Sequence, residues 1–294
     1  MAQTKKEIQS LLTQAEAAPR QRLGQNFMID GNLVRLVAGA AEIRPGDLVL
    51  EIGPGTGTLT EELLITGGEV LAIEIDRNLA ALLRRQFASS PNFRLIEGDA
   101  LAGKHSLNGE LLQAIRQAKS AGRTVRLAAN LPYGIASPLV VELLIAGVDV
   151  LAFTVQREVA DRLHAAGGKD YGPLSMMTQL LSKVEVLRKM PPQAFWPMPK
   201  VDSALVRLTR NDRLGKRAEE FSTFVHRLFS SRRKMLRKAL MQAEIDADRV
   251  LAVTGASPTI RPEELSPEEC LRLFEASGKR RSALATDGNQ MHTD

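Results

Sequence analysis

The sequence is poor in the residues that build disulfides and metal sites. Its single cysteine, Cys270, cannot form an intramolecular disulfide or a cysteine-rich zinc site, and we expect it in the core. The four histidines are scattered without metal-ligand spacing, so no metal is expected. The longest apolar stretch, Leu139 to Phe153, is interrupted by Glu142 and Asp149 and is too short to span a bilayer. The polar segment Met1 to Ser10 lacks the apolar core of a signal peptide, which favours the cytoplasm.

Positive charge is concentrated in one segment of the chain. The 294 residues carry a formal net charge of only +5, yet Phe221 to Leu240 contains no acidic residue. Its apolar residues recur at helical spacing, and its cations fall on the opposite side except for Arg232. Such a stripe suits a phosphate backbone, although a solvated helix face is the alternative. The cations predicted to contact the phosphates of a nucleic acid are Arg227, Arg232, Arg233, Lys234, Arg237 and Lys238.

An apolar run followed by a glycine turn predicts a nucleotide-binding unit. Leu48 to Gly57 reads as a strand that ends in Gly-x-Gly-x-Gly, and a helix signal follows from Thr58 to Leu64. This pattern is typical of the first βα unit of a Rossmann-type domain, in which glycines let the backbone approach a ligand closely. Thr58 stands where the dinucleotide fingerprint has its third small residue. NAD is therefore disfavoured, but a nicotinamide-dependent dehydrogenase stays an alternative.

Three further polar residues follow predicted strands and should share the same edge of a parallel sheet. Glu74 has the spacing expected for a carboxylate that accepts hydrogen bonds from ribose hydroxyls. Asp99 follows a short apolar segment and can accept a hydrogen bond from an adenine amine, and Asn130 follows the apolar run Val125 to Ala129. We therefore predict one crevice at these strand ends, which binds an adenosine-bearing cofactor.

The turn Asn130-Leu131-Pro132-Tyr133 places an amide, carbonyl groups and an aromatic face together at that edge. These groups match the needs of an extruded base, which are acceptors for the N–H bonds of its exocyclic amine and a surface for its ring. Taken alone, the turn also fits a plain Pro-Tyr turn after a buried strand. Its position beside the predicted cofactor crevice favours the base-binding interpretation.

Taken in order, these motifs resemble the signature of the ribosomal RNA adenine dimethyltransferases, and most closely the small-subunit group whose loss confers kasugamycin resistance. The resemblance covers roughly residues 20 to 275, and several motifs in one order are more specific than any single motif. The segments that carry the resemblance are Gln25 to Asp30, Glu51 to Gly57, Glu74 to Asp76, Gly98 to Ala100, Asn130 to Tyr133 and Pro199 to Ala204.

The resemblance implies an S-adenosylmethionine-dependent enzyme that dimethylates N6 of two adjacent adenosines near the 3′ end of small-subunit (16S) ribosomal RNA. Its implied partner is an immature small ribosomal subunit, and we expect the protein to be a monomer without a membrane partner. Carried over by position, Gly53 lies beside the methionine part of the cofactor, Glu74 binds its ribose and Asp99 its adenine. The implied cofactor-binding residues are Asn26, Met28, Glu51, Gly53, Gly55, Glu74, Asp99 and Asn130.

The expected chemistry depends on positioning, because the sulfonium carbon is already a strong electrophile. The Asn130 amide oxygen and the Leu131 or Pro132 carbonyl are expected to accept the N6–H bonds, which favours the pyramidal nitrogen of the transition state. Tyr133 is expected to stack on the extruded base, and the family pattern implies that Phe195 closes over its other face. After the first methyl transfer only one N–H remains to be held, so the pocket must tolerate a methylated amine.

The sequence departs from the family pattern in three places. Gly134 to Ser137 replaces the usual Asn-Ile-Ser after Tyr133, and Ala129 replaces a common glycine. The stretch Lys104 to Arg123 is longer than usual. Because its part from Leu107 to Ala118 is amphipathic, we expect a surface helix without a chemical role there.

The expected elements divide the chain into four parts. These are an N-terminal extension with one short helix, a Rossmann-like α/β domain with a mainly parallel sheet, a small α-helical RNA-binding domain and a disordered tail. A hairpin of Val184 to Met190 and Val201 to Thr209 is expected to close the sheet, and a capping box at Ser266 to Glu269 begins the last helix. The expected bounds of the four parts are 1–20, 21–212, 213–278 and 279–294.

Two alternatives stay open within this interpretation. A non-catalytic ribosome-assembly factor can retain the same fold, although the intact acceptors at Asn130 speak against it. The related large-subunit ribosomal RNA adenine methyltransferase shares most of the motifs. The Asn130 turn and the segment Phe229 to Lys234 resemble the small-subunit group more closely.

Overall fold

The computed structural model describes residues 3–20, 23–103 and 106–278, so the expected tail at 279–294 lies outside the described residues. The chain divides into two compact units. Unit 1 comprises Met1–His164 and Leu181–Asn211, and unit 2 comprises Ala165–Leu180 and Asp212–Asp294. Among the described helices, none has the length and apolar content needed to cross a bilayer.

One unit boundary, at Asn211, lies beside the expected domain boundary at 212. The segment Ala165–Leu180 joins unit 2, although it comes before that boundary in the chain. Its anchor is Tyr171, which is buried, donates a hydrogen bond to the Leu265 carbonyl at 2.6 Å and packs edge-on against Phe229. A tyrosine that satisfies its hydroxyl in this way binds the segment to the helices of unit 2.

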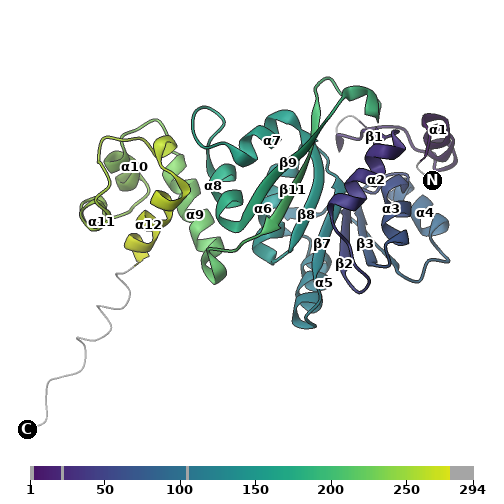
Figure 1. The fold of residues 1–294 in the computed structure, drawn as a ribbon, viewed down its shortest axis with the longest axis horizontal. Helices are drawn as coiled ribbons and strands as arrows, with labels where there is room; N and C mark the ends of the chain where they lie inside the picture. The colour runs from purple at the N-terminus through teal and green to yellow at the C-terminus, as the bar shows by residue number, and fades with distance from the viewer. Residues whose placement is uncertain (1–2, 21–22, 104–105, 279–294) are drawn as a thin grey trace, which may run out of the picture. The chain divides into compact units, whose positions relative to one another are not determined.

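Unit 1 is built on a seven-stranded sheet of described residues in the order β4-β3-β2-β7-β8-β11-β9 (Figure 1). The five strands from β4 to β8 are parallel, whereas β11 runs antiparallel to both β8 and β9. The predicted mainly parallel sheet and its closing hairpin are therefore confirmed. The strands are Leu48–Ile52 (β2), Glu69–Glu74 (β3), Phe93–Glu97 (β4), Val125–Asn130 (β7), Val150–Gln156 (β8), Ser182–Met190 (β9) and Ser203–Arg210 (β11).

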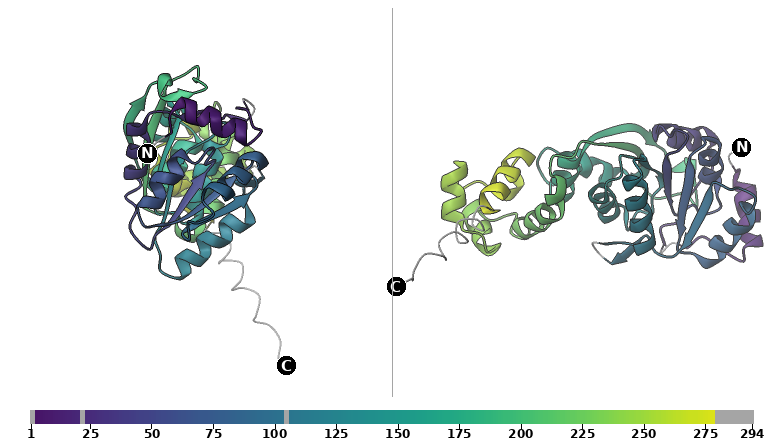
Figure 2. Two further views of the ribbon diagram at one scale, coloured as in Figure 1. Left: turned by 90° about the vertical axis from the view of Figure 1, so that its right-hand side faces the viewer. Right: turned by 90° about the horizontal axis from the view of Figure 1, so that it is seen from below.

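Helices cover both faces of this sheet (Figures 1 and 2). Helices α3 and α4 lie with α2 on one face, and α5 and α6 lie on the other. Strands β2 and β8 are mainly apolar and almost entirely buried, as expected for parallel strands that are covered on both sides. The helices are Gly31–Ala40 (α2), Thr58–Ile65 (α3), Arg77–Gln86 (α4), Gly109–Ser120 (α5), Ala136–Ala146 (α6) and Arg157–His164 (α7).

The strand order reverses between β2 and β7, which lie side by side in the sheet. From β2 the chain continues outward through α3 to β3, and from β7 it continues in the other direction through α6 to β8. In open α/β sheets a ligand crevice forms at such a switch point, outside the carboxyl ends of the strands. The crevice predicted from the sequence therefore lies at the edge that this topology opens.

Short elements complete unit 1. Helix α1 (Lys5–Gln14) confirms the predicted leading helix and lies beside α4 in Figures 1 and 2. The predicted amphipathic surface helix is confirmed as α5, which buries its apolar side chains against β7 and α6. The remaining elements are Phe27–Met28 (β1), which pairs with Phe195–Trp196 (β10), Leu101–Gly103 (β5), which pairs with Ser106–Leu107 (β6), and the 3₁₀ turn Pro192–Ala194 (η2).

Unit 2 is helical and has its own aromatic core. The rings of Phe221 and Phe224 lie 5.3 and 5.5 Å from the ring of Phe274, and Cys270 is fully buried, as predicted. Ser266 and Glu269 form the predicted capping box. The helices are Pro173–Leu181 (α8), Ala218–Phe229 (α9), Leu236–Gln242 (α10), Ala247–Thr254 (α11) and Pro267–Gly278 (α12), with 3₁₀ turns Gly215–Arg217 (η3) and Pro262–Glu264 (η4).

The basic segment Phe221 to Leu240 does not form one helix, although its apolar residues recur at helical spacing throughout. Helix α9 ends at Phe229, and α10 begins only at Leu236. In the turn between them the Lys234 N–H donates to the Ser231 carbonyl, and the Leu236 N–H donates to the Ile260 carbonyl instead of a residue of its own helix. The apolar periodicity continues through the turn because both helices pack on one core, so periodicity alone did not reveal the break.

Candidate active site

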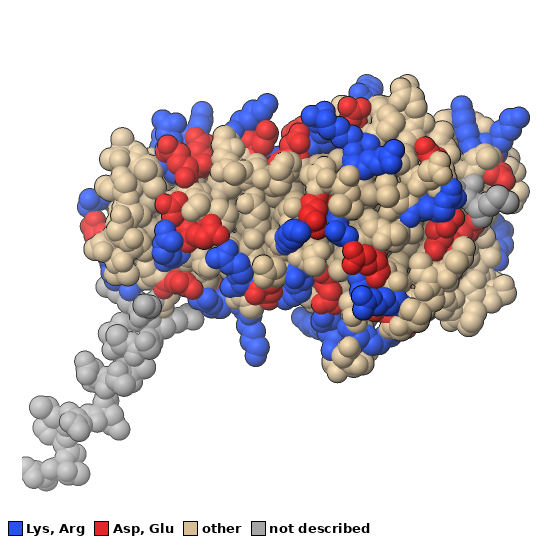
Figure 3. All heavy atoms as spheres, viewed as in Figure 1, with Lys and Arg blue, Asp and Glu red and all other residues tan. Residues whose placement is uncertain are grey.

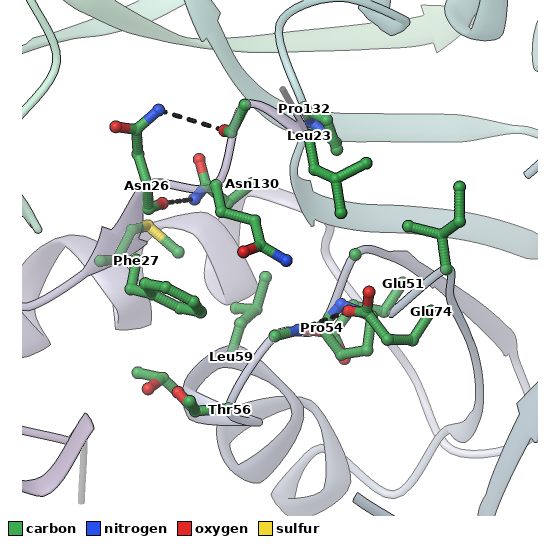
Figure 4. Close-up of a pocket in the computed structure, with 17 residues that line it drawn as sticks. Leu23, Asn26, Phe27, Glu51, Pro54, Thr56, Leu59, Glu74, Asn130 and Pro132 are labelled. Atoms are coloured by element: carbon green, nitrogen blue, oxygen red, sulfur yellow. Dashed lines mark hydrogen bonds between the residues drawn. The ribbon is translucent and has the colours of Figure 1, made fainter. Parts of the chain in front are cut away.

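Two adjoining cavities lie at the carboxyl ends of the parallel strands. The first, of about 80 Å³, is lined by most of the predicted cofactor-binding residues, namely Asn26, Met28, Glu51, Gly53, Gly55, Glu74 and Asn130 (Figure 4). The second, of about 390 Å³, is lined by Gly53, Asp99, Pro132 and Tyr133, among others. The cavities share Leu23, Gly24, Gly53, Ile75 and Pro132. The structure thus brings the predicted strand-end residues together.

The glycine turn after β2 has no room for a larger residue at Gly55. This glycine has a φ of +63°, and a Cβ built on it would lie 2.9 Å from Cε1 of Phe27. Its N–H donates to Oε2 of Glu74 at 3.1 Å. The close ring and the left-handed backbone together explain why the turn requires glycine at this position.

Glu74 ends β3 inside the first cavity and is only 3% exposed. Its Oε1 accepts from the Asp76 N–H at 2.9 Å, and its Oε2 accepts from the Gly55 N–H. Burial raises the pKa of this carboxyl to about 7, against the lowering effect of these backbone hydrogen bonds. Each oxygen retains a lone pair, so the group can accept from the hydroxyls of a bound sugar.

Glu51 lies in β2 behind the glycine turn and is 1% exposed. Burial raises its pKa to about 8, although the hydroxyl of Thr60, which donates to its Oε2 at 2.7 Å, opposes the shift, and the charge of Glu74 adds to it. Glu51 is therefore mainly protonated at neutral pH. The negative charge that faces the first cavity therefore comes mainly from Glu74, and it grows as pH rises through about 7.

The substitution Glu51→Gln is expected to make the unliganded protein more stable at alkaline pH. In the folded protein the pKa of Glu51 is about 8, whereas in the unfolded chain it is near the ordinary value of 4.5. Its contribution to the free energy of unfolding is therefore fully present below pH 4.5 and is lost as pH rises through about 8. Between pH 5 and pH 8.5 the thermal midpoint of the variant should therefore rise relative to the wild type by roughly 5 °C or more. Differential scanning fluorimetry measures this. The exposed Glu158→Gln substitution is the control, and a difference that does not grow with pH contradicts the assignment.

The carboxamide of Asn130 is held by a hydrogen bond at each end. Its Nδ2 donates to the Asn26 carbonyl at 2.5 Å, which joins the end of β7 to the N-terminal segment (Figure 4). Its Oδ1 accepts from the hydroxyl of Thr154 in β8. If the nitrogen and oxygen of the amide were exchanged, Oδ1 would face the Asn26 carbonyl, and two acceptors cannot form a hydrogen bond. The two contacts therefore determine the orientation of the amide.

The carbonyl groups of the turn differ in their partners. The Pro132 carbonyl accepts from the Ile135 N–H at 3.2 Å, whereas no hydrogen bond between described residues uses the Leu131 carbonyl. Leu131 itself is 1% exposed, and its N–H donates to the Thr154 carbonyl at 3.3 Å. Of the two carbonyls predicted to accept from a base amine, that of Leu131 has no competing donor among the described residues.

Tyr133 lines the second cavity and is fixed at its hydroxyl end. The hydroxyl shares a hydrogen bond of 2.7 Å with Oγ of Ser203, the first residue of β11. Burial raises the pKa of the Tyr133 phenol, so the ring stays neutral at physiological pH. A neutral ring that is anchored at one end provides a rigid surface for stacking.

The structure does not bring Phe195 to either cavity. Its side chain is 2% exposed and belongs to an apolar cluster that includes Met28 and Leu205. In strand β10 it pairs with Met28 of β1, and this pairing directs the ring into the core. The expectation that Phe195 faces a bound base is therefore not met in this conformation, because packing in the core buries the ring.

The cations of the basic segment fall into two groups. Arg232 pairs with Glu263 at 3.1 Å and Arg237 pairs with Asp248 at 2.5 Å, so these two have acidic partners although the segment itself contains no acidic residue. The others are exposed and form no ion pair with any described residue; we call Arg227, Arg233, Lys234 and Lys238 the unpaired cation group. On the face shown in Figure 3, Lys and Arg alternate with Asp and Glu, which agrees with the modest net charge.

Sequence reasoning missed two polar residues that support the site. Gln3 is 6% exposed; its Oε1 accepts from the hydroxyls of Thr56 and Thr58, and its Nε2 donates to the Thr56 carbonyl. The second is Thr154, which lies in β8 and donates to Oδ1 of Asn130. No local signal in the sequence identifies either residue, because their partners lie far away in the chain.

Comparisons with known proteins agree on one family. The model described as Ribosomal RNA adenine dimethylase matches residues 17–278. The Ribosomal RNA small subunit methyltransferase A of Moorella thermoacetica is 40% identical over 271 residues, which cover 88% of this chain and 93% of that protein. The protein of the same name from Pseudomonas syringae pv. syringae is 38% identical over 267 residues, which cover 89% of this chain and 95% of that protein.

Solved structures share the fold. The crystal structure of 23S rRNA methyltransferase ErmE aligns with a TM-score of 0.62 and 29% identity, covering 86% of this chain and 99% of that chain. A dimethyladenosine transferase from Plasmodium falciparum aligns with a TM-score of 0.64 and 23% identity, covering 84% of this chain and 95% of that chain. The predicted Rossmann-like fold with a helical C-terminal part is confirmed by these alignments.

Proposed function

The chain belongs to the ribosomal RNA adenine dimethylase family, and on this premise we propose that it dimethylates N6 of adenosines in small-subunit (16S) ribosomal RNA. The proposed target is a pair of adjacent adenosines near the 3′ end of that RNA, within an immature small subunit. One observation carries the proposal: Asn130 is held with its amide oxygen fixed on the cavity that also contains Glu74 and the glycine turn. A cytoplasmic monomer is part of the same proposal.

The residues of the two cavities fit S-adenosylmethionine, which when bound supplies an activated methyl carbon. The narrow first cavity suits its amino-acid chain, and the wider second cavity suits its purine. In this arrangement Glu74 accepts from the ribose hydroxyls, and Asp99 at the exposed rim accepts from the adenine amine. The ionised form of Glu74 also favours a ligand that carries positive charge.

Cofactor affinity is expected to rise with pH across neutrality. Because the pKa of Glu74 is about 7, its carboxylate is mostly protonated at pH 6 and mostly ionised at pH 8. The dissociation constant for S-adenosylmethionine should therefore fall about tenfold between these values. Calorimetry measures the dissociation constant at each pH for the wild type and for the control Glu74→Gln. Because the ligand's own groups titrate equally with both proteins, a difference in pH dependence between them reports on Glu74. Equal pH dependence in the two proteins contradicts the role of Glu74.

In the proposed reaction the catalytic turn positions the target amine. Oδ1 of Asn130 and the Leu131 carbonyl accept the two N6–H bonds, and this directs the nitrogen lone pair toward the methyl donor. Tyr133, which borders the cavity proposed for the cofactor's purine, stacks on the extruded target base. The protein itself contributes acceptors, a stacking surface and exclusion of water, so positioning supplies most of the rate enhancement.

The direct test is methyl transfer to the proposed substrate. Purified protein, labelled S-adenosylmethionine and immature small subunits that lack the modification should together yield dimethyladenosine. Mass spectrometry of digested RNA then locates the modified nucleotides. Label found only in protein or DNA contradicts the proposal, and binding to the subunits without any transfer indicates a non-catalytic assembly factor.

A large-subunit substrate is the second candidate, and the alignment with 23S rRNA methyltransferase ErmE favours it. The curated relatives described above are small-subunit methyltransferases, which supports the first candidate instead. Parallel reactions with unmodified large and small subunits distinguish the two. Dimethyladenosine in large-subunit RNA alone would replace the small-subunit proposal.

A further inference from the structure

Thr154 lies opposite the catalytic asparagine in the sheet. In the pairing of β7 with β8, Asn130 is the partner of Thr154, and the threonine side chain is fully buried. Its hydroxyl donates to Oδ1 of Asn130 at 2.5 Å, and its carbonyl accepts from the Leu131 N–H at 3.3 Å. One residue therefore contacts both members of the turn that are proposed to accept from the target amine.

The hydroxyl of Thr154 limits what Asn130 can do. The terminal torsion of an asparagine side chain has a broad energy profile, so its amide plane rotates easily. Hydrogen bonds to both the nitrogen and the oxygen of the amide restrict this rotation. Nδ2 is held by the Asn26 carbonyl and Oδ1 by Thr154, so the amide plane is determined from two sides. An amide oxygen has two lone pairs, and Thr154 occupies one of them. The other is available to an N–H of the substrate.

The two methyl transfers place different demands on this oxygen. An unmodified adenine offers two N6–H bonds, and two acceptors orient it. An N6-methyladenine offers a single N–H, so its orientation depends on one acceptor alone. Misplacement of reacting atoms by about 1 Å can lower a rate by roughly 10²-fold. The second transfer should therefore be more sensitive than the first to loss of the bond that fixes the acceptor.

We propose that Thr154 is a positioning residue, which acts through Asn130 and is needed chiefly for the second methyl transfer. The proposal rests on the proposed adenine dimethylation. It predicts that Thr154→Val, which keeps the shape of the side chain but loses the hydroxyl, lowers kcat about 10- to 30-fold. The KM for RNA should change less than about twofold, and N6-methyladenosine should accumulate. Thr154→Ser restores the donor and should return the product to dimethyladenosine.

The experiment compares Thr154→Val, Thr154→Ser and the control Thr178→Val in full-length protein. Thr178 is also fully buried, and its hydroxyl donates to the Leu174 carbonyl in unit 2, so its loss should cost stability without changing the product. Mass spectrometry gives the ratio of monomethylated to dimethylated adenosine. An independent readout is the ¹⁵N spectrum of the Asn130 side-chain amide, whose protons should exchange faster with water in Thr154→Val than in wild type.

The outcomes separate the two proposals. If wild-type protein transfers no methyl group, the proposed function fails, whereas the amide exchange still reports whether Thr154 holds Asn130. If wild type forms dimethyladenosine and Thr154→Val forms it at the same rate and ratio, the positioning role is wrong. The role is also wrong if Thr154→Ser behaves like Thr154→Val, or if Thr178→Val gives the same shift in product.

Discussion

Replacing Asn130 with alanine is expected to reduce methyl transfer about 10³-fold, a loss comparable to removing one preorganised hydrogen-bond partner at a reacting centre. Alanine removes the acceptor for the N6–H bond and also the contact to the Asn26 carbonyl. The loss should appear in the single-turnover rate with saturating RNA and S-adenosylmethionine. RNA affinity should stay near the wild-type value, because the unpaired cation group is untouched.

Two further substitutions make this prediction specific. Asn130→Asp keeps an acceptor but places a carboxylate oxygen against the Asn26 carbonyl, so we expect a rate between those of alanine and asparagine. The exposed Asn32, which accepts a hydrogen bond from Arg35, is the matched control, and Asn32→Ala should retain the wild-type rate. An Asn130→Ala protein with more than a tenth of the wild-type rate would show that Asn130 does not hold the amine.

Removing the unpaired cations is expected to weaken RNA binding about 30- to 100-fold near physiological salt, with little effect on folding. The variant combines Arg233→Ala, Lys234→Ala and Lys238→Ala. These side chains are exposed and form no ion pair within the described part of the chain, so their charge is available to phosphates. The slope of log affinity against log salt should fall by about 2, because each lost phosphate contact removes roughly 0.7. Filter binding across a salt series measures both quantities.

A charge-matched variant tests whether position matters. Arg213→Ala, Arg217→Ala and Arg237→Ala together remove the same charge from unit 2, but each of these arginines pairs with an acidic partner, namely Glu268, Glu275 and Asp248. Exposed pairs of this kind are worth about 0–1 kcal/mol each, so the variant should still fold. We expect a loss of RNA affinity below about fivefold. Equal losses in the two variants would mean that net charge, and not the unpaired cation group, governs binding.

Much of the fold was predictable because the relevant signals are local. Apolar runs such as Leu48 to Ile52 predict strands, and residues three positions apart predict the helix caps. Because predicted strands and helices alternate along the chain, the sequence also predicts parallel strands joined by helical crossovers. The crevice was predictable for the same reason. Strand ends in a parallel sheet share one edge, so Glu74, Asp99 and Asn130 had to meet near the glycine turn.

The errors arose where packing overrides a local pattern. The apolar spacing in Phe221 to Leu240 is helical throughout. The Leu236 N–H nevertheless donates to the Ile260 carbonyl, and the segment forms two helices, α9 and α10, with a turn between them. Nothing in the segment itself reveals that Arg232 and Arg237 have acidic partners from later in the chain. The burial of Phe195 in this conformation also depends on the cluster around it, and its place over a bound base stays a prediction.

The sequence by itself determined the class of protein: a parallel α/β sheet with a glycine turn, strand-end acceptors and a basic helical region, because each of these is encoded in neighbouring residues. Only the tertiary structure decided how the catalytic group is held. The contacts of Thr154 with Asn130, and of Gln3 with Thr56, join residues that are far apart in the chain. Such contacts depend on which strands and segments become neighbours on folding, and they leave no periodic trace in the sequence.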